Sequence, residues 1–89
     1  MKTVLLDAGL PDKAAALARI GRELGLGEAA PRNLDALWDV LRGDVRGPFA
    51  IVWRDHARAQ ERLGADFDAL CGLLRRLATE RRDFTFTLA

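Results

Sequence analysis

Three short apolar runs, far apart along the chain, constrain the fold more than any other feature. They cover residues 3–6, 48–53 and 84–88. The first two are continuously apolar, as in buried strands, and the third alternates apolar and polar residues, as in a strand with one buried face. Parallel strands need long crossover connections, and the intervening segments have helical spacing. We therefore predict an α/β fold in one domain, residues 1–89: a three-stranded parallel β-sheet with helical crossovers packed on it.

Capping residues and apolar stripes predict the helices between these strands. Asn33, Asp55 and Asp66 each stand where a side chain can cap a helix N-terminus. Gly43 and Gly64 stand where helix-ending glycines are expected. The apolar residues at helical spacing are Leu17, Ile20, Leu24, Leu34, Leu37, Trp38, Leu41, Phe67, Leu70, Cys71, Leu74 and Leu77.

Composition excludes several kinds of chemistry. The chain has no Ser and no Tyr, so neither a serine triad nor a tyrosine nucleophile can form. One His cannot build a multi-histidine metal centre, and one Cys can form neither a multi-cysteine zinc site nor an internal disulfide. No glycine pattern for binding phosphate is present. We expect no cofactor and no metal, and a binding protein rather than an enzyme.

Charge and hydropathy limit which classes of partner and which cellular compartment are expected for this chain. Lys+Arg 14 against Asp+Glu 13 gives a net charge of +1, which is too balanced for a dedicated nucleic-acid binder. No apolar run is long enough to span a membrane. The N-terminus lacks the pattern of a secretory signal. We expect a cytoplasmic protein without membrane attachment, for which direct binding of nucleic acid is disfavoured.

Two acidic residues stand out on the helix predicted to begin after Asn33. Asp35 and Asp39 are four residues apart and share one face, and Trp38 lies between that face and the apolar stripe. Asp39 is also within reach of Arg42, three residues on. The pattern alone leaves three interpretations: a solvated helix face, a face that binds a cationic partner, or a carboxylate pair for acid–base chemistry.

Residues 33–43, with the sequence NLDALWDVLRG, resemble the central helix of the barstar family, the intracellular inhibitors of the bacterial ribonuclease barnase. The order of elements, the strand ending at Trp53 and the final strand extend the resemblance along the whole chain. The resemblance implies the same three-stranded parallel α/β fold. It also implies that acidic residues take the place of RNA phosphates in the ribonuclease active site and bind its Arg and His residues.

Carried over by position, the resemblance makes Asp39 the principal anchor and Asp35 the second. The partner would be a barnase-like bacterial ribonuclease or a related cationic toxin, and the free protein would be a monomer. The implied partner-binding residues are Asn33, Leu34, Asp35, Trp38, Asp39, Arg42, Gly43, Asp44, Arg76 and Glu80.

The chain also departs from the family pattern. Residues 29–31 are Ala-Ala-Pro where the family has two aromatics and a Gly, and Asp44 and Arg76 replace an aromatic and an acid. Glu80 is retained. These departures favour a different target, so a protein-binding module or an immunity protein for a different cationic toxin stays open. Two other functions also stay open: an RNA binder that uses Arg75 with Arg76, and a small enzyme.

Several other notable residues are predicted to be structural. Trp53 ends an apolar strand and should lie in the core, and Cys71 should be a packed, inert thiol. His56 should face solvent or help to cap a helix. Arg81 and Arg82 are expected on a solvated helix face.

Overall fold

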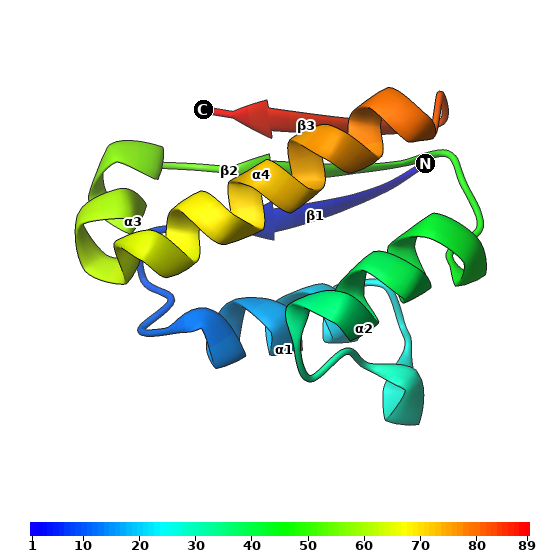
Figure 1. The fold of residues 1–89 in the computed structure, drawn as a ribbon, viewed down its shortest axis with the longest axis horizontal. Coiled ribbons are helices and arrows are strands. Elements are labelled where there is room, and N and C mark those ends of the chain that lie inside the picture. Colours follow the sequence, from blue (N-terminus) through cyan, green and yellow to red (C-terminus); the bar gives the residue numbers. More distant parts are fainter.

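The computed structural model describes all of residues 1–89 and contains one three-stranded sheet (Figure 1). Its strands are β1 (Lys2–Leu6), β2 (Phe49–Trp53) and β3 (Phe84–Leu88), in the order β1-β2-β3. Both neighbouring pairs are parallel. The predicted α/β class and the position of each strand are therefore confirmed.

Two pairs of helices connect the strands. Between β1 and β2 the chain forms α1, a short 3-10 turn η1, and α2, which runs directly into a π-helical segment η2. Between β2 and β3 it forms α3 and α4. The bounds are α1 Lys13–Glu23, η1 Gly27–Ala29, α2 Leu34–Asp39, η2 Val40–Asp44, α3 His56–Leu63 and α4 Ala65–Glu80.

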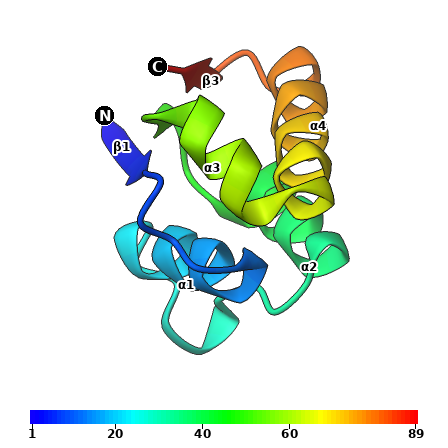
Figure 2. The same ribbon diagram turned by 90° about the vertical axis from the view of Figure 1, so that its left-hand side faces the viewer.

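All of these helices lie on one side of the sheet, as Figure 2 shows. The strands follow one another in a single direction across the sheet, so both right-handed crossovers return over the same face. The opposite face is open on β1, where Thr3 and Leu5 are exposed. The prediction of a fully buried first strand is therefore wrong, because β1 is an edge strand with one solvated face.

One apolar cluster fills the space between the sheet and the helices, and no polar side chain is buried in it. Trp53 is fully buried, as predicted, and its ring lies 4.7 Å from that of Phe67 on α4. The Trp53 indole N–H donates to the carbonyl of Asp7 at 3.3 Å, so the one polar atom of this side chain is satisfied. The core thus holds α4 firmly against β2.

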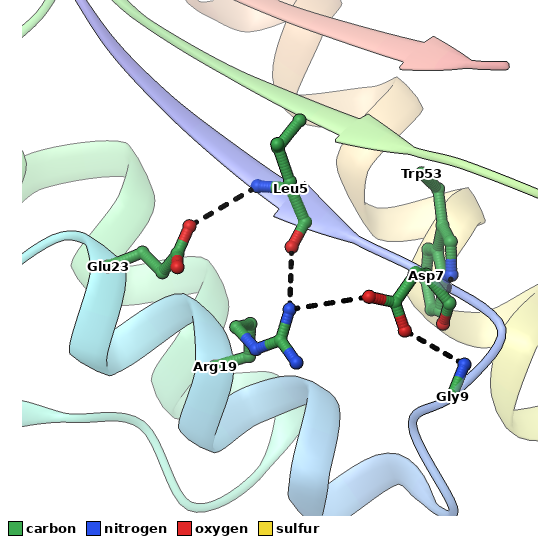
Figure 3. A network of polar contacts seen from close by, with 6 residues as sticks. All are labelled: Leu5, Asp7, Gly9, Arg19, Glu23 and Trp53. Carbon is green, nitrogen blue, oxygen red and sulfur yellow. Dashed lines mark hydrogen bonds and ion pairs between the residues drawn. The ribbon is translucent and has the colours of Figure 1, made fainter.

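At Leu5, side chains of α1 cover the outer edge of β1 (Figure 3). The backbone N–H of Leu5 donates to Glu23 at 3.4 Å, and its carbonyl accepts from Arg19 at 3.1 Å. Arg19 also lies 3.6 Å from the carboxylate of Asp7. An edge strand would otherwise offer these backbone groups to another chain.

Two of the predicted helix starts are corrected. Asn33 caps α2 as predicted, because its side-chain oxygen accepts from an amide of the first turn at 2.8 Å. Asp55 precedes α3 but makes no capping bond, since its backbone is left-handed with φ 53°. Asp66 is not a cap: α4 starts after Gly64, and Asp66 lies in its first turn. A carboxylate there still favours the helix N-terminus.

The end of α2 also differs from the prediction. Gly43 does not end the helix but lies inside η2, which continues to Asp44. The amide of Val45 bonds to the carbonyl of Val40, five residues back, at 3.1 Å. This wider turn extends the helix past the predicted glycine stop. No helix of the chain has the length and hydropathy needed to cross a membrane.

Candidate functional site

The exposed face of α2 is acidic. Leu37 is fully buried under the helix, whereas Asp35 and Asp39 are exposed and Trp38 is half-buried between them and the core. No Lys, Arg or His of this chain forms an ion pair with either aspartate. Two carboxylates are thus held one helical turn apart with no internal counterion.

A groove of about 670 Å³ lies between this face and α4. It is lined by Leu34, Asp35, Trp38, Asp39, Asp68, Ala69, Gly72, Leu73 and Arg76. The structure therefore brings most of the predicted acidic face together with Arg76 of α4. Leucine and tryptophan side chains form part of the lining, so the groove offers apolar contact beside charge, as binding sites usually do.

An ion-pair chain crosses from α4 to η2 beside the groove. The Arg76 guanidinium lies over the Trp38 ring, 5.0 Å from its centre, and its Nε is 3.5 Å from Glu80. The other Glu80 oxygen lies 3.4 Å from Nε of Arg42. The predicted pairing of Arg42 with Asp39 is therefore wrong, because Arg42 turns to Glu80 and leaves Asp39 free. Such exposed pairs contribute little stability, so they orient side chains more than they hold the fold.

Not every predicted site residue reaches the groove. Asn33 positions α2 through its cap, and Gly43 is exposed in η2. Asp44 lines a separate hollow near the N-terminus, with Arg46 among its neighbours. Sequence reasoning missed the groove residues of α4 before Arg76, which are Asp68, Ala69, Gly72 and Leu73. Their only sequence signal is helical spacing from Arg76, which places them on its face.

A second hollow, of about 720 Å³, lies where β1 and β2 end. Its lining residues are Asp7, Ala8, Gly9, Asp55, Arg58, Glu61 and Arg62. Acidic side chains are interleaved with both arginines, and Arg62 donates to the carbonyl of Ala8 at 3.3 Å. This mixture does not form the continuous basic surface that a nucleic-acid binder presents.

Comparison with protein families tests the resemblance. The family model for barstar, described as a barnase inhibitor, matches residues 1–89. This chain belongs to the barstar family. The whole-chain match confirms the family predicted from residues 33–43, and barstar is an inhibitor family rather than a catalytic one.

This barstar-family chain has a tightly packed segment before α2. Pro31 is buried, and Ala30 lies so close to α1 that a β-carbon added to Gly21 would sit 2.6 Å from the Ala30 side chain. The Ala-Ala-Pro sequence therefore rests against α1. It fixes the approach to Asn33, and with it the start of the acidic helix.

At the C-terminal end of α2, the side chain of Arg81 contacts the adjoining segment η2. The prediction of a solvated Arg81 is wrong: its side chain is only 15% exposed. It donates to the carbonyls of Leu41 and Val45 at 2.7 and 2.8 Å and makes a two-pronged contact with Asp83. These hydrogen bonds to Arg81 hold the pKa of Asp83 below its usual value. Arg82 is exposed, as predicted.

The remaining polar candidates have structural surroundings. Burial raises the pKa of the Cys71 thiol to about 11, so it stays protonated at neutral pH, as expected of an inert packed cysteine. His56 is half-buried, and its Nδ1 lies 3.0 Å from the carbonyl of Ala89, beside the end of β3. No cluster of three or more His, Cys, Asp or Glu side chains is arranged to hold a metal ion.

Proposed function

We propose that this protein is a stoichiometric inhibitor of a ribonuclease of the barnase type, or of a related cationic toxin. It covers the active site of that enzyme with the acidic face of α2, with Asp39 as the principal anchor and Asp35 as the second. The observation that carries the proposal is the pair of exposed carboxylates without an internal counterion. A partner's cations can bind them without first breaking an ion pair.

The mechanism is occupation rather than chemistry. A ribonuclease cleft holds Arg, Lys or His side chains where it binds RNA phosphate, and a carboxylate can accept charge-assisted hydrogen bonds from the same groups. Asn33 and the core under Leu37 hold α2 in place before the partner arrives. Preorganisation of this kind lowers the entropy lost on binding. The half-buried Trp38 adds apolar contact at the rim.

The basic residues of the surface bear on which ribonuclease is bound. Arg76 lies in the groove and Arg42 stands next to it, so the surface is acidic at one end and basic at the other. The net charge of +1 gives little long-range attraction toward a basic enzyme. We infer that the target carries acidic or aromatic groups beside its cationic cleft, where they meet Arg76.

The test is a calorimetric titration into a barnase-type ribonuclease, with RNA cleavage measured on the same samples. We expect one-to-one binding and loss of cleavage. The Asp39→Ala variant should bind about 3 kcal/mol more weakly, on the order of 100-fold, because the partner's cations are left buried and unpaired. Asp35→Ala should lose less.

Asp66→Ala is the matched control. Like Asp35, Asp66 is an exposed aspartate in the first turn of a helix, but it lies outside the groove. Its replacement should leave the affinity unchanged. A folded Asp39→Ala protein that inhibits as well as the parent would contradict the proposed interface. Absence of binding by the parent protein to basic ribonucleases would contradict the proposed function itself.

A further inference from the structure

The end of α4 holds the segment that follows the acidic face of α2. Arg81, the residue after α4, donates from one guanidinium nitrogen to the carbonyls of Leu41 and Val45, at 2.7 and 2.8 Å. Its other two nitrogens contact Asp83 at 2.9 and 2.7 Å. The same group lies 4.9 Å from the centre of the Phe49 ring. Every nitrogen of this guanidinium is therefore engaged.

The π-helical geometry of η2 explains why this contact is needed. In an α-helix the carbonyl of Leu41 would accept from the amide of Val45, four residues on. Here that amide reaches back to Val40 instead, and the carbonyl of Leu41 loses its helical partner. An unpaired carbonyl close to the core costs free energy. Arg81 supplies the missing donor, so the wide turn and the arginine depend on each other.

We propose that Arg81 is the positioning residue of the acidic face: by holding one carbonyl of η2 and the carbonyl of Val45 directly after it, it sets where α2 presents Asp39. Asp39 is the last residue of α2, and η2 begins at the next residue. Glu80, which precedes Arg81, pairs with Arg42 in the same turn. The end of α4 thus holds both the backbone and a side chain of the segment after Asp39. The binding part of this inference rests on the proposed function.

The chain offers a matched pair of variants, Arg81→Lys and Arg82→Lys. A lysine keeps the charge but has one ammonium group, which cannot match the guanidinium fork toward Asp83 while reaching two carbonyls. Arg82 is the adjacent arginine, is exposed, and makes no side-chain hydrogen bond or ion pair. Arg81→Lys should therefore weaken the hydrogen bonds that hold η2, and Arg82→Lys should leave them unchanged.

Amide hydrogen exchange tests the contact without any partner. In Arg81→Lys we expect exchange at Val45 to accelerate at least tenfold more than exchange at Ile51, in the centre of the sheet. In Arg82→Lys neither amide should change. Equal acceleration of both amides in Arg81→Lys would overturn the proposal, because it would show general destabilisation. If Arg81→Lys does not fold, Asp83→Asn is measured in the same way, because it replaces one of the two oxygens that orient Arg81 with an amide donor and removes the negative charge.

A double-mutant cycle tests the effect on binding. Arg81→Lys should weaken binding of a barnase-type ribonuclease at least tenfold, and Arg82→Lys less than twofold. In the Asp39→Ala background, Arg81→Lys should cost less than threefold, because the carboxylate that it positions is already gone. The same cost in both backgrounds would overturn the positioning role. Failure of the proposed function is distinguishable, because the parent protein would then not bind a basic ribonuclease at all, while the Val45 exchange result would be unaffected.

Discussion

Cys71 and Arg81 lie close to the apolar core and respond to that environment in opposite ways. Cys71 has no partner that would stabilise a thiolate enough to offset its burial, so it remains a neutral thiol. The guanidinium of Arg81 is satisfied near the core, because backbone carbonyls and a carboxylate accept from all of its nitrogens. Burial alone therefore does not decide how a polar side chain behaves; the available acceptors do.

The raised pKa of Cys71 predicts a loss of stability in alkali. The unfolded thiol has a pKa of 9.0 and the folded thiol about 11. Above pH 9 the unfolded state therefore releases the proton first, and the free energy of unfolding falls as the pH rises toward 11. Urea titrations at pH 8, 9, 10 and 11 should show this loss in the parent protein but not in Cys71→Ala.

Subtracting the result for Cys71→Ala from that for the parent removes the contributions that the two proteins share. Below pH 9 the difference between the two proteins should be constant and should reflect packing alone. A difference that stays constant up to pH 11 would contradict the role given to the buried thiol.

Two helical glycines, Gly21 and Gly72, differ in the space around them. This packing, rather than helix propensity, decides the effect of a substitution. Gly21 lies in α1 under the Ala30 side chain, and an added β-carbon would sit 2.6 Å from it. Gly72 lies in the middle of α4, and an added β-carbon would have no neighbour within 4 Å. The same mutation should therefore have opposite effects at the two positions.

Gly72→Ala should stabilise the protein by about 0.5–1 kcal/mol, because alanine loses less backbone entropy on entering a helix. Gly21→Ala should destabilise it by roughly 1–3 kcal/mol, since Ala30 and α1 must move apart. Urea denaturation of both variants against the parent measures this. Stabilisation by both substitutions would show that the contact between α1 and Ala30 is unimportant.

Sequence patterns are sufficient to predict which helices and strands form and in what order. They are insufficient to predict at which residues the helices begin and end. Asn33 can be predicted as a cap because a capping bond is local, between residues three apart. Asp66 resembles a cap in the sequence, but α4 starts earlier, after Gly64 with its positive φ. Gly43 resembles a helix stop, because nothing nearby in the sequence indicates that Arg81 stabilises a wider turn forty residues away.

In the candidate site, too, local features can be predicted from the sequence and features that depend on tertiary packing cannot. Asp35, Trp38 and Asp39 share a helix, so their common face could be predicted from spacing alone. The part of the groove contributed by Asp68 and Gly72 depends on how α4 packs beside α2, which no local pattern encodes. The family resemblance located Arg76 and Glu80, whereas their links to Trp38 and Arg42 became evident only from the fold.

At the scale of the whole molecule, one apolar cluster joins every layer. It contains residues from all three strands and all four α-helices. No separate core supports either half of the chain. Since each element is buried against the same cluster, losing any one of them exposes the others.

We therefore expect cooperative unfolding with a single urea midpoint. The two tryptophans give probes at different depths, with Trp53 in the core and Trp38 at the groove. Fluorescence of a Trp38→Phe protein should report Trp53, and its midpoint should coincide with that of far-ultraviolet circular dichroism. A fluorescence transition at lower urea would show that the helical layer and the sheet separate before the helices melt.

The two edges of the sheet are unequal, and this limits how the molecule can polymerise. Glu23 and Arg19 occupy the backbone groups of Leu5 on β1, whereas no side chain bonds to the outer backbone of β3 around Phe86. Strand addition between copies is therefore expected first at β3. Once two copies have joined there, the free edges of the pair are two β1 strands whose Leu5 backbone groups are already bonded, which disfavours growth of the sheet into a fibre.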